Sequence, residues 1–123
     1  MSMEIFSSLQ RQDAKSLVLF QAIQAKLVAS GSPHAYLMSA RDWARRFFDE
    51  RPDDVLLGEW IAVLDAAMAS PEGLERLYEL MLSTDQHAID LRSSSPFPGV
   101  LSQQERTAVL RAFEEFWGRG AIT

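Results

Sequence analysis

Residues 54–68 read DVLLGEWIAVLDAAM, and this stretch decides the fold. Placed on a helix at about 100° per residue, its large apolar side chains fall in one arc, and the small and charged ones fall opposite. The arc contains Leu56, Leu57, Trp60, Ile61, Val63, Leu64, Ala67 and Met68. It is wider than the ~100° apolar stripe of an ordinary surface helix, which indicates neighbours on two sides. We therefore expect this helix to lie at the centre of a helical bundle, with Trp60 in the core.

Helical periodicity extends over most of the chain, and no stretch alternates between apolar and polar residues as a strand does. Further helices are predicted over residues 13–29, 32–50, 70–82, 83–91 and 102–117, with a short helical lead-in within residues 1–12. The sequence contains no internal repeat, and nothing in it indicates a second domain. The predicted fold class is therefore all-α, a single compact helical bundle of five to six helices that forms one domain over residues 1–123.

Capping residues support the predicted helix starts. A serine followed by proline opens two helices, at Ser32 and Ser70, since proline is favoured at the first helical position. Asp53 or Asp54 is placed to cap the central helix. Ser102 and Glu105 have the spacing of a capping box, in which each side chain accepts a hydrogen bond from the other residue's amide.

The C-terminal part combines a loop with a last helix. Residues 92–100, RSSSPFPGV, have the composition of a loop, and Phe97 between two prolines is expected to plug the edge of the core. Gly118 and Gly120 are expected to end the last helix. The apolar residues predicted to face inward on that helix are Val109, Leu110, Phe113, Phe116 and Trp117.

The composition excludes several classes of protein. The chain has 123 residues and no cysteine, which excludes disulfides, thiolate catalysis and cysteine-ligated metal sites. No apolar run reaches the ~18 residues of a membrane span, and the first residues have no signal-peptide pattern. We therefore expect a cytoplasmic protein that does not enter membranes.

Charge is distributed unevenly along the chain. Residues 1–51 carry seven basic and five acidic groups, whereas residues 52–123 carry five basic and twelve acidic groups. The excess of acidic groups disfavours a nucleic-acid partner and permits a basic protein partner. The simpler alternative is a solvated exterior that only maintains solubility. The acids chosen as the candidate partner-binding surface are Glu59, Asp65, Glu72, Glu75 and Glu79.

Residues that could support catalysis are sparse. His87 and Asp90 have the spacing to share one side of a short helix, but two ligands do not make a metal site. Exposed helical carboxylates lack the desolvation that general acid–base catalysis needs. The chain also contains no glycine-rich phosphate loop, nucleophile elbow or HExxH sequence. We expect no enzymatic activity, no metal and no cofactor.

These observations favour a non-enzymatic protein-binding module, an adaptor, inhibitor or regulatory subunit, that presents an acidic helical face to a partner. The alternative is a small DNA-binding transcriptional regulator that uses the last helix. The residue types there that can read base edges or contact phosphates are Gln103, Gln104, Arg106, Thr107 and Arg111.

The central helix also carries a line of small residues opposite its apolar arc. Gly58, Ala62 and Ala66 would let a second helix approach closely, either within the fold or across a homodimer. The simpler alternative is an exposed alanine face without a partner.

Overall fold

The computed structural model describes residues 10–122, which form six helices and no strand. The helices are α2 (Arg11–Ala29), α3 (His34–Glu50), α4 (Val55–Ala69), α5 (Pro71–Leu82), α6 (Gln86–Ser93) and α7 (Gln103–Ile122). The all-α fold class and the predicted helix number are confirmed. The helical lead-in expected in the first residues lies outside the described part of the chain.

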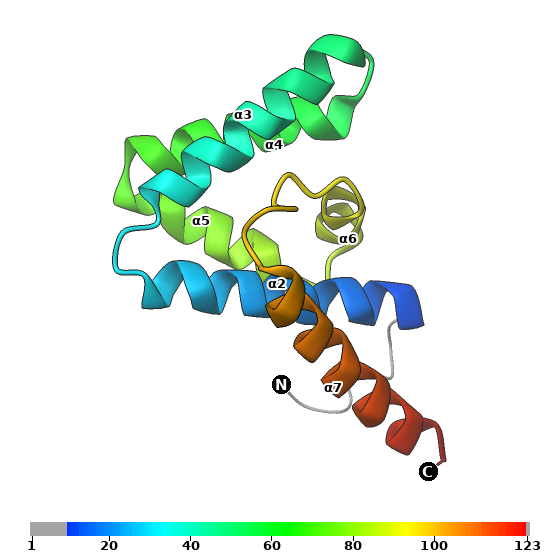
Figure 1. The fold of residues 1–123 in the computed structure, drawn as a ribbon. Helices are drawn as coiled ribbons and strands as arrows, with labels where there is room; N and C mark the ends of the chain where they lie inside the picture. Colours follow the sequence, from blue (N-terminus) through cyan, green and yellow to red (C-terminus); the bar gives the residue numbers. More distant parts are fainter. Residues whose placement is uncertain (1–9, 123) are drawn as a thin grey trace.

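The helices form two groups, one of α3, α4 and α5 and the other of α2 and α7. In Figure 1, α3 and α4 run side by side as an antiparallel pair, and α5 continues from α4 towards α2. The short helix α6 contacts α2, α4 and α5, and so connects the two groups. The last helix, α7, packs across α2 and then extends away from the rest of the bundle (Figure 1).

Trp60 of α4 lies at the centre of the main core. Its side chain is fully buried, and the indole Nε1–H donates a 2.7 Å hydrogen bond to the carbonyl oxygen of Leu91 in α6. The Phe20 ring of α2 stacks beside the indole at a centroid distance of 6.1 Å, and the Phe97 ring meets both edge-on. The central role of the 54–68 helix is confirmed. Phe97, expected at the edge of this Trp60 core, belongs to its middle.

Three helices begin with the caps that the sequence predicts. The carboxylate of Asp54 accepts a hydrogen bond from the amide three residues later, and Ser70 Oγ does the same at 3.0 Å for α5. At α7, the Ser102 amide donates to Glu105 Oε1 at 2.8 Å, and the Glu105 amide donates to Ser102 Oγ at 3.0 Å. These bonds satisfy first-turn amides that have no partner within their helix.

Several helix boundaries differ from the prediction: α2 begins at Arg11 rather than at residue 13, α6 spans Gln86–Ser93 rather than residues 83–91, and the start of α3 and the end of α7 also differ. No side chain caps α3, which begins at His34, because its N-cap residue is Pro33 rather than Ser32, and a proline side chain has no hydrogen-bond acceptor. The last helix continues through Gly118 and Gly120 rather than ending there. Glycine lowers helix stability by only about 1 kcal/mol relative to alanine, so glycine alone does not force an end.

A smaller apolar cluster joins α7 to α2, and we call it the α7 seam. Its buried members are Ala14, Leu17 and Phe113, with Val18, Leu82, Phe116 and Trp117 packed against them. Of the α7 residues predicted to face inward, Phe113 is buried and the other four are half-buried. Two ion pairs flank the seam, Arg11 with Glu114, and Lys26 Nζ with Glu105 Oε1 at 2.6 Å.

Candidate functional site

The five acids singled out in the sequence lie on α4 and α5, and the structure divides them into two groups. Glu59 and Asp65 of α4 are paired with basic side chains of the same chain. Glu72, Glu75 and Glu79 of α5 are exposed, and none makes a hydrogen bond or ion pair with a described residue. The five residues therefore do not form one uniform surface.

Both α4 acids interact with neighbouring helices. Asp65 faces α3, where its carboxylate oxygens lie 3.2 Å from Arg41 Nη1 and 3.6 Å from Arg45 Nη2. Glu59 interacts through Oε2 with His87 Nε2 of α6. All these groups are partly exposed, and such pairs contribute about 0–1 kcal/mol each. The two arginines balance the charge of Asp65, and His87 gives Glu59 a hydrogen-bond partner.

His87 and Asp90, whose spacing alone is insufficient for a metal site, interact with different residues. His87 interacts with Glu59, while Asp90 accepts a 2.9 Å hydrogen bond from Gln86 Nε2 one turn earlier in α6. Within the described residues, no group of three or more histidine or acidic side chains is placed to hold a metal ion.

The three α5 acids form a continuous row. Glu72, Glu75 and Glu79 follow one another at helical spacing, so they share one exposed side of α5, and we call them the acidic row. Beside the row lies a shallow groove of about 360 Å³ between α4 and α5, the α4–α5 groove. The groove is lined by Glu59, Ala62, Val63, Ala66, Gly73, Arg76 and Leu80.

The groove exists because α4 and α5 meet at a glycine. A Cβ added at Gly73 would lie 2.0 Å from the carbonyl oxygen of Ala66, so any larger residue would force the helices apart. The small residues of α4 therefore lie in two different environments. Gly58 faces the Phe48 ring of α3 within the fold, whereas Ala62 and Ala66 are exposed in the groove.

The α7 residues of the DNA-binding alternative are all exposed. Gln103, Gln104, Thr107 and Arg111 line a shallow depression of about 410 Å³ together with the alanine at position 108. Arg106 borders a different cavity, between α7, α2 and α6. The depression therefore carries a single cation, and phosphate binding generally uses several.

The structure buries a residue that the sequence analysis assigned to a loop. Arg92 lies in the last turn of α6 and is only 3% exposed. Its Nη1 donates to the carbonyl oxygens of Leu80 and Met81, each at 3.2 Å, whereas its buried Nε and Nη2 have no hydrogen-bond partner among the described atoms. Burial lowers the pKa of this guanidinium, and the charge of nearby Asp13 raises it. The sequence does not reveal this burial, because three serines follow Arg92 and a run of serines is typical of a loop.

Comparison of the chain with protein-family models, with curated proteins and with solved structures finds no match. Within residues 10–122, no helix combines the length and the apolar character needed to cross a membrane.

Proposed function

We propose that this protein is a non-enzymatic protein-binding module, an adaptor, inhibitor or regulatory subunit, that binds a basic partner. The observation that supports the proposal is the acidic row, three exposed carboxylates on one side of α5 with no basic partner among the described residues. The α4–α5 groove next to it offers exposed small apolar side chains. A partner segment that carries Lys or Arg beside small apolar residues would fit both features.

Electrostatics explains why such a row favours association. Glu75 and Glu79 are four residues apart on one helix, and like charges at that spacing destabilise it by a few tenths of a kcal/mol. A basic partner replaces this repulsion with attraction and accelerates encounter, mainly through the association rate. Apolar contact in the groove would then fix the position of the partner.

The α4 acids take different parts in this proposal. Glu59 borders the groove and remains within the contact surface. Asp65 contributes less, because Arg41 and Arg45 of α3 already balance its charge. A cytoplasmic location belongs to the proposal, and a second copy of the chain is the alternative occupant of the groove.

The test compares two triple charge reversals on the full chain. The row variant is Glu72→Lys, Glu75→Lys, Glu79→Lys, and the matched control is Asp42→Lys, Asp49→Lys, Glu50→Lys on the exposed side of α3. Partners captured from the native host are identified by mass spectrometry, and association rates are then measured by surface plasmon resonance at low and high salt. Both variants are first checked for unchanged thermal stability.

We expect the row variant to associate about tenfold more slowly than wild type at low salt, with a smaller difference at high salt. The control variant should keep most of the wild-type rate. If the row variant associates as fast as wild type at low salt, the row is only a solvated exterior.

The DNA-binding alternative is tested by titrating duplex DNA in a gel-shift assay at several salt concentrations. Binding that weakens steeply with salt, and that Arg111→Gln reduces, would favour the alternative. We expect no retardation at physiological salt.

A further inference from the structure

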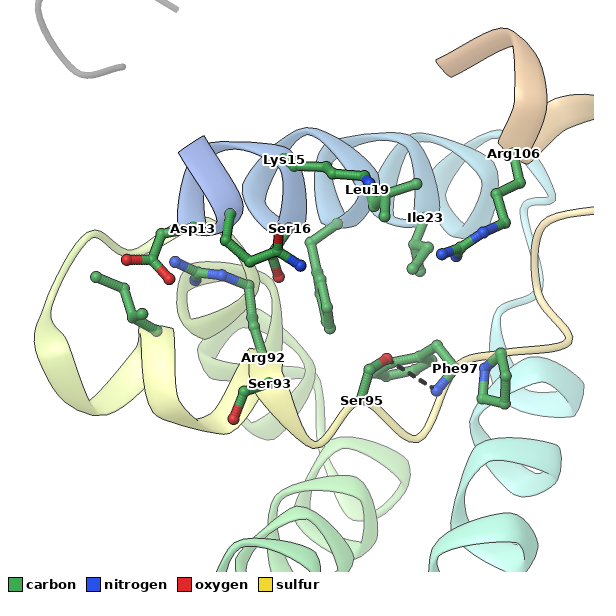
Figure 2. A pocket seen from close by; sticks show the side chains of 14 residues that line it. Asp13, Lys15, Ser16, Leu19, Ile23, Arg92, Ser93, Ser95, Phe97 and Arg106 are labelled. Atoms are coloured by element: carbon green, nitrogen blue, oxygen red, sulfur yellow. Dashed lines mark hydrogen bonds between the residues drawn. The ribbon is translucent and has the colours of Figure 1, made fainter. Parts of the chain in front are cut away.

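A cavity of about 400 Å³ lies between α2, α6 and the loop that precedes α7 (Figure 2). Part of its wall is apolar, made by Phe20 and Ile23 of α2 and by Phe97 of the loop. The Phe97 segment has a local hydrogen bond, in which the Phe97 amide donates to the side-chain Oγ of Ser95 at 3.2 Å. Cavities of this size hold small organic molecules, for which ~300–1,000 Å³ is typical.

The charged residues of the wall are predominantly basic. Lys15, Arg92 and Arg106 line the cavity together with a single acid, Asp13. Figure 2 shows Arg92 extending from α6 towards α2 and Asp13, while Arg106 extends towards the cavity from α7. Neither the Lys15 side chain nor the Arg106 side chain makes a hydrogen bond or ion pair with a described residue. The cavity therefore has an excess of positive charge that the described part of the chain does not neutralise.

Part of this positive charge has a fixed position, because the Arg92 side chain is held by hydrogen bonds. A guanidinium presents five N–H donors in a planar fork that matches the oxygens of a carboxylate or phosphate. In Arg92, Nη1 is held by two backbone carbonyls, and Nε and Nη2 are buried without an acceptor. Buried donors without an acceptor cost about 1–3 kcal/mol each, and more when they carry charge. An oxyanion in the cavity would supply both the acceptors and the opposite charge.

We propose that this cavity binds a small organic anion, an oxyanion carried on an apolar body. Arg92, which lines the cavity, supplies the guanidinium that meets the oxyanion. Arg106 and Lys15 supply further positive charge, and the body rests on Phe20, Ile23 and Phe97. This inference is independent of the acidic row, whose residues lie on α5 and do not line the cavity.

The first experiment measures thermal stability and calorimetric binding of the full chain with four probes. Octanoate and octyl phosphate combine an oxyanion with an apolar body, whereas octan-1-ol has only the body and inorganic phosphate only the charge. We expect at least one of the first two to raise Tm in a concentration-dependent manner, because a ligand that binds the folded state stabilises it. Octan-1-ol and inorganic phosphate should bind at least tenfold more weakly. The comparison of octanoate with octyl phosphate distinguishes a carboxylate ligand from a phosphate ligand.

The second experiment tests the basic residues. Arg92→Lys keeps the charge but removes the planar fork, and it is informative only where it folds, because Arg92 bonds two backbone carbonyls. The exposed Arg106 and the half-exposed Lys15 avoid this difficulty, so the main variant is Lys15→Gln, Arg106→Gln. Arg46→Gln, an exposed change on α3 outside the cavity, is the matched control. We expect the double variant to weaken binding of the better anion about tenfold and the control to leave it unchanged.

Four outcomes would overturn the proposal. Equal binding of octan-1-ol would show an apolar pocket without anion recognition, and equal binding of inorganic phosphate would show an adventitious ion only. Binding of the anion to the Lys15→Gln, Arg106→Gln variant as tightly as to wild type would place the ligand elsewhere. The absence of binding by both octanoate and octyl phosphate would contradict the proposal directly.

Discussion

The Trp60 core and the α7 seam are both built from apolar side chains, yet they differ in how many elements they join. The core unites residues of α2, α3, α4, α5 and α6 with Phe97 and Val100 of the loop, and its indole is hydrogen-bonded to Leu91. The seam joins α7 mainly to α2, through three buried residues. Elements with few buried contacts open locally before the whole protein unfolds. The difference indicates that α7 detaches more easily than any helix of the core (Figure 1).

The largest expected effect is that of Trp60→Ala. Removing the fully buried indole should lower the free energy of unfolding by roughly 3–5 kcal/mol, since it leaves a cavity and removes one of the two hydrogen bonds that the Leu91 carbonyl accepts. Chemical denaturation measures the loss, and Trp43→Ala, at a half-buried position, should cost less. A loss below about 1 kcal/mol would mean that Trp60 is not the centre of the core.

Phe113→Ala tests the seam with a comparable aromatic truncation. We expect a smaller loss, about 2–3 kcal/mol, because the seam has few other buried groups and can close around the gap. Hydrogen exchange should accelerate along α7 and stay nearly unchanged along α4. Equal acceleration in both helices would instead make the seam and the core one cooperative unit.

Ser102→Ala tests the start of α7. Loss of the hydroxyl that accepts the Glu105 amide should cost about 1 kcal/mol. Ser32→Ala is a matched control, because Ser32 precedes a helix but its side chain caps nothing there. We expect the control to change the denaturation midpoint by less than half as much, and similar losses would remove the capping interpretation.

The smallest effect concerns pH. Hydrogen bonds from Lys26 and Ser102 lower the pKa of Glu105 from 4.5 to about 2. A carboxylate with a depressed folded-state pKa stabilises the protein above its unfolded pKa, and the contribution is lost as pH falls from about 4.5 to about 2. Wild type should therefore exceed Glu105→Gln in denaturation midpoint at pH 6, and the two should converge near pH 2. A difference independent of pH would show that the Glu105 charge is not responsible.

The sequence predicts the elements of the core and the seam well because their signals are local. Periodicity identifies the central helix, and the side chains of Asp54, Ser70 and Ser102 mark helix starts within a few residues. Gly118 and Gly120 mislead because propensity is a weak constraint on the end of a helix. Trp43 follows the buried Ala40 at helical spacing on α3 but is only half-buried, so periodicity gives the direction of a side chain but not how far the neighbouring helix covers it.

The candidate sites are harder to predict because they depend on contacts between distant residues. Asp65 has an acidic sequence neighbourhood, and its pairing with Arg41 appears only when α3 folds back along α4. The burial of Arg92 depends on carbonyl groups at the end of α5 and on the packing of α2. Composition could identify the acidic row, since its three glutamates are close in sequence, but not the cavity.

The placement of the three tryptophans gives the chain a set of natural optical reporters. Trp60 sits in the core, Trp117 in the α7 seam and Trp43 on the surface of α3 beside Phe47. Indole emission shifts to longer wavelength when water reaches the ring, so each tryptophan reports on its own region. In a chain with Trp43 and Trp60 replaced by Phe, fluorescence would follow α7 alone while circular dichroism followed all helices. The detachment of one helix could then be timed without attaching any label.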